Sequence, residues 1–95
     1  MDYILTYDLE RGHTQVKKYL LEKGYREEIA TDSGNMKLPN TTLIGDRPNS
    51  KVVSADFKEA CNVYNATCLF EKDKIKNSSH FVIKIDYSDG WIENN

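Results

Sequence analysis

The chain has 95 residues, 39% of them hydrophobic, which is enough for one compact domain but not for two. Its 13 basic and 15 acidic residues are interspersed and leave a net charge of −2, so net charge predicts no strong, sequence-independent attraction to nucleic-acid phosphates. There is no apolar stretch long enough to span a bilayer and no signal-peptide pattern after Met1, so we expect a cytoplasmic protein without a membrane partner.

The first predicted strand covers residues 3–9, because polar and apolar side chains alternate there with a period of two. Its two faces differ: one carries Tyr3, Leu5, Tyr7 and Leu9, and the other carries Ile4, Thr6 and Asp8. Asp8 stands at the carboxyl end of this strand, just before a predicted helix. The strand therefore ends in an acidic side chain on its more polar face.

The first predicted helix covers residues 13–23. Val16, Tyr19 and Leu20 recur there at helical spacing among polar residues. Gly24 then supplies a C-terminal stop, because glycine readily adopts the backbone conformation that ends a helix.

Two short strands are predicted next. Residues 25–31 alternate in polarity, and their charges suit the edge of a sheet. Residues 32–35 are dense in turn formers, and residues 38–45 include three β-branched side chains. We therefore expect residues 25–31 and 38–45 to pair as a hairpin. A loop follows at residues 46–50, where Pro48 biases its predecessor away from helix.

The second helix has the clearest pattern in the chain. Its apolar stripe, at positions i, i+3, i+4 and i+7, is formed by Phe57, Ala60, Cys61 and Tyr64. Ser54 is the expected N-cap. After this helix, residues 66–71 are either a short strand or an irregular connector, and residues 72–79 are expected to be a loop.

Residues 80–87 give the strongest strand signal. One face carries Phe81, Ile83, Ile85 and Tyr87, and the other carries His80, Val82, Lys84 and Asp86. Turn residues at 88–90 end the strand. Trp91 is too apolar to leave in water, so we expect it to pack across the sheet or against a second subunit.

The order strand, helix, strand, strand, helix, strand predicts a single α+β domain over residues 1–95 with a ferredoxin-like βαββαβ fold. Both helices then cover one face of an antiparallel sheet and leave the other face open. We expect Ile4 and Val82 on the open face, among polar side chains. Such a surface suits a homodimer formed by apposed sheets, or a partner-binding face, with Trp91 as a further contact.

Several charged residues have two interpretations each. Arg11 and Arg47 follow the first and third strands, where each either reaches a phosphate through a bidentate contact or forms an ion pair with a carboxylate. Residues 72–76 hold the largest local excess of lysine, which is more typical of a solvated turn than of a nucleic-acid site. His13 and His80 stand at element boundaries, and nothing in the sequence pairs them.

Asp8 is the residue most suited to chemistry, and two hypotheses are open for it. A short acidic side chain in this position often caps the turn or helix that follows. The alternative is a metal ligand, because divalent cations such as Mg²⁺ bind carboxylate oxygens. Thr6, two residues earlier on the same face, either donates a hydrogen bond to a substrate or fills a strand position.

Three segments carry a resemblance to a known group: residues 7–9, residues 37–44, and residues 81–86 with the later pair at 90–91. In these segments, and in element order over nearly the whole chain, the sequence resembles the superfamily of the small CRISPR-associated nuclease-like protein of the second Cas type, virulence-associated protein D and SinR-like proteins. The resemblance implies a ferredoxin-like homodimer, which in some members cleaves RNA or DNA with a divalent metal.

The resemblance also implies roles for individual residues. Asp8 matches the strand-end aspartate, which in such dimers faces its symmetry mate, and two such carboxylates would hold one Mg²⁺ that activates a water and offsets charge on the phosphate. The implied function is a Mg²⁺-dependent endonuclease with Asp8 as catalytic residue and metal ligand. Thr6, Arg11 and Arg47 are the expected substrate contacts.

A second class of function fits the acidic balance of the chain better. It is a dimeric, non-catalytic module that binds a protein partner or regulates a defence, toxin or mobile-element system. Ile4 and Val82 would then carry the partner contacts. A small-ligand sensor is a third class, because the same fold serves several functions.

Overall fold

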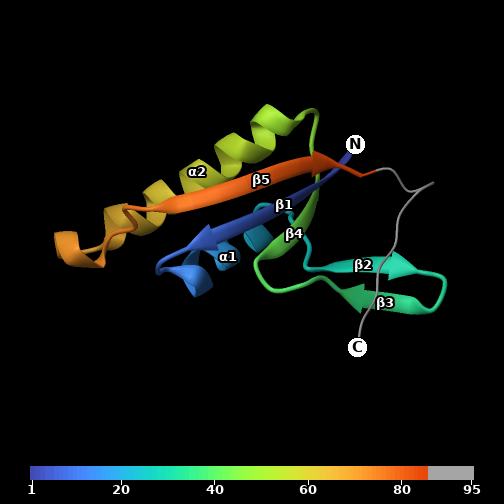
Figure 1. The fold of residues 1–95 in the computed structure, drawn as a ribbon, viewed down its shortest axis with the longest axis horizontal. Helices are drawn as coiled ribbons and strands as arrows, with labels where there is room; N and C mark the ends of the chain where they lie inside the picture. Colours follow the sequence, from blue (N-terminus) through green and yellow to red (C-terminus); the bar gives the residue numbers. More distant parts are fainter. Residues whose placement is uncertain (86–95) are drawn as a thin grey trace.

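In the structure, a computed structural model that describes residues 1–85, three consecutive strands separate the two α-helices, with one strand before and one after them (Figure 1). The elements are β1 (Asp2–Leu9), α1 (His13–Glu22), β2 (Glu28–Thr31), β3 (Gly34–Lys37), β4 (Thr42–Asp46), α2 (Ser50–Thr67), the short 3₁₀ helix η1 (Glu71–Asp73) and β5 (Ser78–Lys84). None of the helices in residues 1–85 is both long and apolar enough to cross a membrane.

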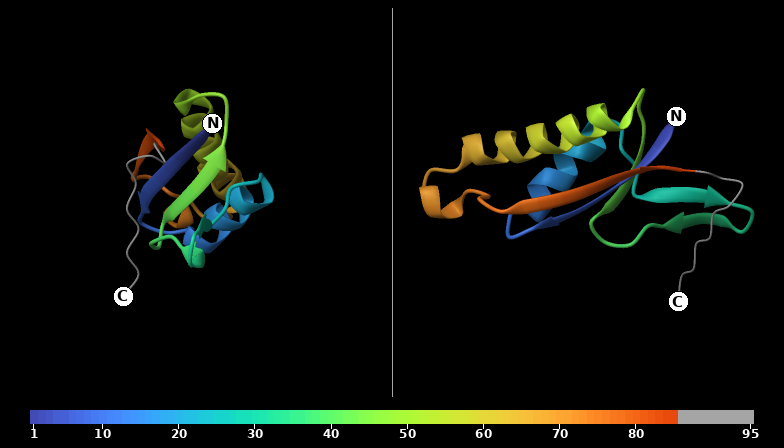
Figure 2. Two further views of the ribbon diagram at one scale, coloured as in Figure 1. Left: turned by 90° about the vertical axis from the view of Figure 1, so that its right-hand side faces the viewer. Right: turned by 45° about the horizontal axis from the view of Figure 1, so that its top comes forward.

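β1 is the middle strand of a three-stranded antiparallel sheet in the order β4-β1-β5. Its buried side chains are the predicted set Tyr3, Leu5, Tyr7 and Leu9. They share one core with apolar side chains from α1 and α2, among them Val16, Leu20, Val53 and Phe57. Both helices therefore pack on the same face of the sheet, as predicted and as Figure 2 shows.

The strands between the helices pair differently from the prediction. β2 pairs with β3 in a separate hairpin, whereas β4, which covers the second half of the expected hairpin partner, pairs with β1. The hairpin turn is tight, since β2 ends at Thr31 and β3 begins at Gly34. The Thr31 hydroxyl donates a hydrogen bond across it to the carbonyl oxygen of Gly34 at 2.6 Å. An isolated bridge between Arg26 and Ile44 joins the two sheets. The structure thus has an α+β architecture with two helices and antiparallel sheets.

The last strand, β5, buries the opposite face to the one predicted. Val82 lies opposite Leu5 and packs against the core, so its assignment to the open face is wrong. Phe81 and Ile83 lie on the open face instead and are 60% and 50% exposed. Both alternating sets of this strand contain apolar side chains, so alternation did not decide which set is buried. Trp91 lies outside the described residues.

α2 begins one turn earlier than predicted. Asn49 is its N-cap, with the side chain accepting a hydrogen bond from the Val52 N–H at 3.0 Å, and Ser54 lies inside the helix. The buried Val53 extends the apolar stripe back by a turn, which favours the earlier start. At the other end, residues 66–71 form the last helical residues and the lead into η1, and no strand is present there.

Tyr25 requires a glycine in the neighbouring strand. A Cβ at position 45 of β4 would overlap the Tyr25 ring. The ring has no cheap way to move aside, because it is buried and its hydroxyl donates to Asp56 at 2.8 Å. Gly45 is therefore set by this close approach of side chain to backbone.

We expect Gly45→Ala to lower the free energy of unfolding by about 1–3 kcal/mol, because the added methyl overpacks a rigid contact. Urea unfolding followed by far-ultraviolet circular dichroism measures this loss. Ser79→Ala, at an exposed position of β5, is the control and should change stability by less than about 0.5 kcal/mol. A Gly45→Ala protein as stable as the parent would contradict the assigned contact.

Candidate functional site

Asp8 has an exposed side chain at the end of β1, opposite Ser79 of β5. Its carboxylate forms no hydrogen bond or ion pair with any other residue in the range 1–85. The N-cap of α1 is Gly12, in the left-handed conformation (φ 77°), and no side chain caps that helix. Within the described chain, the capping hypothesis for Asp8 is therefore wrong, and the carboxylate is available to an external ligand.

Asp8 lies between two open hollows. One is lined by Leu9, Glu10 and residues 77–79, and the other by Thr6, Tyr7 and residues 79–81. Most of the residues that line the first hollow have hydroxyl, amide or carboxylate side chains, whereas the second includes the exposed ring of Phe81. A ligand that contacts Asp8 can therefore extend either toward the loop before β5 or across the open face.

Glu10 fixes this end of the sheet and was missed in the sequence. Its Oε1 accepts hydrogen bonds from the backbone N–H groups of Lys76 at 2.7 Å and Asn77 at 3.3 Å. The Lys76 bond is the largest cause of a lowered pKa for the Glu10 carboxyl, so it is ionised at neutral pH. Glu10 holds the segment before β5 against the loop after β1, and so keeps Ser79 beside Asp8.

Arg11 lies in the loop after β1, three residues beyond Asp8, and its side chain contacts Lys72 and Glu10. A guanidinium N–H of Arg11 donates to the backbone carbonyl oxygen of Lys72, and Nε lies 4.0 Å from Glu10 Oε1. Its side chain is still 42% exposed. Arg11 therefore ties the loop after β1 to η1 and keeps part of its donor capacity at the surface.

Thr6 lies on the open face, as predicted, but its hydroxyl has a partner. The Thr42 hydroxyl donates to Thr6 Oγ1 at 3.4 Å, across the β1–β4 pair. Thr6 is half-buried and also lies opposite Phe81 of β5. The contact with Thr42 thus supports the interpretation that Thr6 fills a strand position. A hydrogen bond from Thr6 to a substrate stays a prediction.

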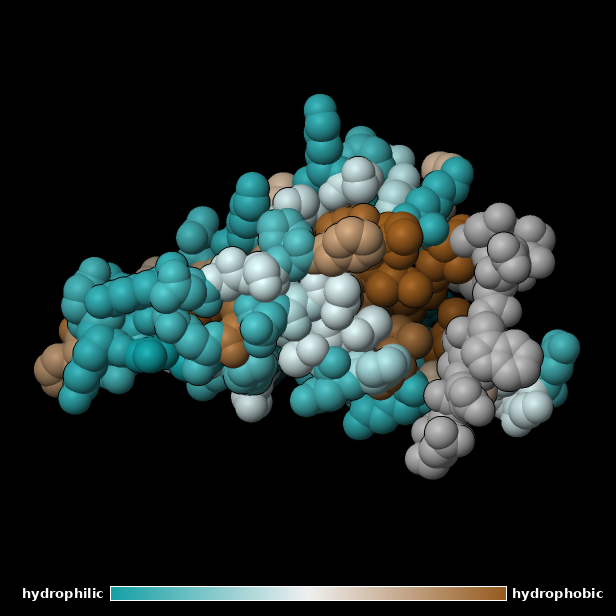
Figure 3. Space-filling model, in the orientation of Figure 1, coloured by the Kyte–Doolittle hydropathy of each residue, from teal (hydrophilic) through white to brown (hydrophobic). Residues whose placement is uncertain are grey.

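The open face carries more apolar surface than predicted. Ile4 is half-buried on this face. Phe81 and Ile83, which the sequence pattern placed on the buried face of the last strand, are exposed beside it. Figure 3, which views this face, shows apolar surface over the sheet beside the more polar end of the molecule. Asp8 therefore lies at one end of a sheet face that is apolar in its middle.

Arg47 lies at the other end of β1, since its neighbour Asp46 pairs with Asp2. Its Nε donates to Asp56 Oδ2 at 3.0 Å, and its two terminal nitrogens donate to the carbonyl oxygens of Asp46 at 2.8 Å and Lys23 at 2.6 Å. The guanidinium also stacks 4.4 Å from the Tyr25 ring centre. The ion-pair interpretation of Arg47 is confirmed, and the structure does not bring this residue to Asp8.

Asp56 is a buried charged residue that the sequence pattern did not predict. Its side chain is 9% exposed and accepts from Tyr25 Oη and Arg47 Nε, with Lys23 Nζ 3.5 Å away. Burial, the largest single influence, raises the pKa of Asp56, but the hydrogen bonds from Tyr25 and Arg47 together with the Lys23 charge hold it below its ordinary value. Its position on the apolar side of α2 was the only available signal.

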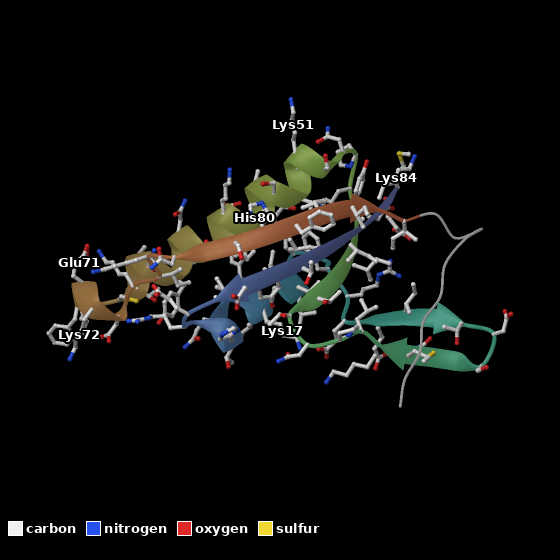
Figure 4. All side chains as sticks on the ribbon, viewed as in Figure 1. Lys17, Lys51, Glu71, Lys72, His80 and Lys84 are labelled. Atoms are coloured by element: carbon white, nitrogen blue, oxygen red, sulfur yellow. The ribbon has the colours of Figure 1, made fainter. Side chains whose placement is uncertain are left out.

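His80 faces the helices rather than the open face. Its Nε2 lies 2.6 Å from Ser54 Oγ, and its ring packs on Phe57 with centroids 4.9 Å apart. Burial, with a smaller contribution from the charge of Lys58, lowers the pKa of His80. His80 therefore joins β5 to α2, and it also lines one of the two hollows beside Asp8. Figure 4 labels its position on β5.

The described part of one chain does not hold a complete metal site. Among residues 1–85, no cluster of three or more histidine, cysteine, aspartate or glutamate side chains is placed to hold an ion. Asp8 contributes a free carboxylate, whereas the nearby Glu10 already accepts two backbone N–H groups through Oε1. A site at Asp8 would need ligands from a second chain or from water.

Comparisons with protein-family models, with curated proteins and with solved structures find no match to this chain. The resemblance of residues 7–9 and their companion segments to small metal-dependent nucleases stays a prediction. The described parts of those segments are the end of β1, the connection from β3 into β4, and the second half of β5.

We expect Asp56→Asn to destabilise the protein by about 3–5 kcal/mol at pH 7, because it leaves the half-buried Arg47 guanidinium without its counter-charge. The folded-state pKa of Asp56 lies below that of the unfolded chain, about 3.9. Its contribution is therefore present above about pH 4 and lost as the pH falls through the folded-state pKa.

Urea unfolding at pH 7 and at pH 3 measures both effects. The difference in stability between parent and Asp56→Asn should shrink at the lower pH, whereas the exposed Asp32→Asn should match the parent at both. Equal stability of Asp56→Asn and parent at pH 7 would rule out this ion pair as a major contributor.

Proposed function

We propose that this protein is a homodimeric endonuclease that depends on a divalent metal and acts on RNA or DNA, of the type seen among relatives of the second Cas type and virulence-associated protein D. The observation that carries the proposal is the Asp8 carboxylate, exposed at a strand end, on the sheet face that the helices leave open and without a partner in residues 1–85. An unpaired acid held by a rigid strand is well placed to bind a cation.

The proposed fold is the ferredoxin-like βαββαβ arrangement. The strand order β4-β1-β5 supports it, because the first strand of that fold is central and antiparallel to both neighbours. The Arg26–Ile44 bridge adds further support, since it places the chain leading into β2 beside β4. In this proposal the β2–β3 hairpin is an extension of the same sheet beyond that bridge.

The proposed dimer apposes the open faces of two chains. Phe81 and Ile83 are exposed there and Ile4 is half-buried, so a second copy would remove apolar surface from water. A two-fold contact presents the same patch on both chains and therefore duplicates every residue in it. Asp8 borders this patch at the end of β1, and in the proposed dimer the two-fold axis passes close to this end, so that Asp8 faces its symmetry mate from the other chain.

The donors at this site suit a hard cation. Mg²⁺ prefers oxygen ligands and retains several waters, so two carboxylates are enough from the protein. The chemistry that such an ion supplies is a more acidic bound water and compensation of charge on a phosphate. Asp8 would hold the cation from each chain, and Arg11, partly exposed beside it, would orient a phosphate oxygen by hydrogen bonding.

We expect Asp8→Ala to reduce Mg²⁺- or Mn²⁺-dependent cleavage of RNA or DNA by about a hundredfold or more, because the metal site loses both of its protein ligands. Cleavage is followed on labelled oligonucleotides by denaturing electrophoresis. Asp32→Ala, an exposed aspartate in the β2–β3 turn, is the matched control and should cut at the parental rate.

Two results would overturn the nuclease proposal. One is parental protein that cuts neither RNA nor DNA with either metal. The other is an Asp8→Ala protein that cuts as fast as the parent while the metal dependence persists.

A second candidate function rests on the exposed apolar side chains themselves. Phe81 and Ile83 form an apolar surface that would bind a partner without catalysing a reaction. The net charge of −2 gives little general attraction to phosphates. In this alternative the chain is a dimeric module that binds a protein of a defence, toxin or mobile-element system. Asp8→Ala would then leave its activity in the cell unchanged.

Under either candidate, Ile83→Asp should dissociate the dimer, because it places a charge in the apposed apolar faces. Sedimentation velocity measures the change in mass. Lys18→Asp, at an exposed position of α1 on the other side of the sheet, introduces the same acid away from this face and should remain dimeric. A parental protein that is monomeric at micromolar concentration, or an unchanged Ile83→Asp dimer, would contradict the proposed interface.

A further inference from the structure

The connection from α2 to β5 exposes two large apolar side chains. Leu69 is 91% exposed and Phe70 is 59% exposed. They immediately precede η1, which Figure 4 locates at one end of the long axis through the labels on Glu71 and Lys72. Neither side chain contributes to the core, so folding does not explain their presence.

Cationic side chains accompany this apolar pair. Lys72 Nζ lies 5.7 Å from the centre of the Phe70 ring, and Lys76 is exposed three residues before Ser79. Neither lysine forms an ion pair with a carboxylate in residues 1–85, whereas Lys74 is paired with Glu71 at 3.1 Å. The loop therefore presents an aromatic ring and two ammonium groups without an ion-pair partner in residues 1–85. Its net charge over residues 69–77 is +1, because Glu71 and the exposed Asp73 offset two of its three lysines.

This loop is tied directly to the Asp8 end of the sheet. Arg11 donates to the Lys72 carbonyl, and Glu10 accepts from the N–H groups of Lys76 and Asn77. The hollow beside Asp8 is lined by residues 77–79. At about 3.3 Å per extended residue, Lys76 lies roughly 10 Å along the chain from the residue opposite Asp8.

We propose that residues 69–77, with Arg11, bind single-stranded nucleic acid and direct it toward Asp8. Phe70 stacks on an unpaired base, and Lys72, Lys76 and the exposed edge of Arg11 contact successive phosphates. The inference rests on the proposed nuclease function, for which it specifies the form of the substrate. A base inside a duplex has no free face for Phe70, so the loop selects single strands.

The charges of the loop favour a nucleic-acid strand over an anionic lipid surface. Insertion of Leu69 and Phe70 into a bilayer would bring the exposed Glu71 against the headgroups. A single strand contacts one side of the loop and need not approach Glu71 or the exposed Asp73. The sequence alone favoured a solvated turn at residues 72–76, and the added observations are the exposed ring and the link to Asp8.

The test measures binding separately from cleavage. The full chain carrying Asp8→Ala is titrated, in EDTA, into a fluorescent 12-nucleotide RNA and its DNA equivalent, and anisotropy reports affinity. Phe70→Leu should weaken binding about 5- to 100-fold, because it removes stacking but keeps an apolar side chain, whereas Phe70→Tyr should bind as the parent does.

The lysines are tested through salt dependence. Lys72→Ala with Lys76→Ala should reduce the slope of log affinity against log salt concentration by about 1.4, which corresponds to two phosphate contacts on a single strand. Lys51→Ala, an exposed lysine on α2 whose position Figure 4 labels, is the control and should leave the slope unchanged.

Equal binding by Phe70→Leu and Phe70→Tyr, or an unchanged salt slope in the double lysine variant, would overturn the proposal. The proposal would also be overturned if the protein bound phosphatidylserine vesicles but neither RNA nor DNA, and if Phe70→Leu bound those vesicles as well as the parent does. Phe70-dependent binding by a parent that cuts nothing would uphold the strand-binding loop and refute the nuclease. Cleavage that persists at the parental rate in Phe70→Leu and the double lysine variant would refute only the loop.

Discussion

One buried carboxylate determines how the parts of this protein are held together. Asp56 on α2 binds Tyr25 and Arg47, with Lys23 close by, and so connects the end of α1, the chain entering β2 and the end of β4. Burial of a charge is costly unless it is paired and hydrogen-bonded, so the four groups stabilise one another as a unit. The network fixes both helices against one face of the sheet and leaves the other face available for binding.

Asp8 and Asp56 show how position gives the same chemical group different roles. Asp56 is surrounded by donors, and its pKa is held low despite burial. Asp8 is exposed at the opposite side of the sheet and has no partner in residues 1–85. Glu10 stands between these cases, because it is near the surface but committed to two backbone groups. Among these three acids, Asp8 is the one whose carboxylate has no partner in residues 1–85.

The sequence predicted features that depend on local periodicity and missed those that depend on distant partners. The faces of β1 and the span of α1 followed from alternation and helical spacing. The buried face of β5 did not, because apolar side chains occur in both alternating sets and only pairing with Leu5 decides for Val82. Likewise, nothing near Arg47 indicates that it will stack on Tyr25, which is far away in the sequence. Asp8 was identified from its strand-end position, but its freedom from partners required the structure.

The proposed chemistry requires two chains to share one cation, and metal stoichiometry tests this most directly. The full chain, free of metal, is titrated with Mn²⁺ in a calorimeter while its mass is determined in the same buffer. The account predicts one Mn²⁺ for every two chains in a dimer, with no binding in Asp8→Ala. A stoichiometry of one ion per chain, or binding that Asp8→Ala retains, would contradict a shared site at Asp8.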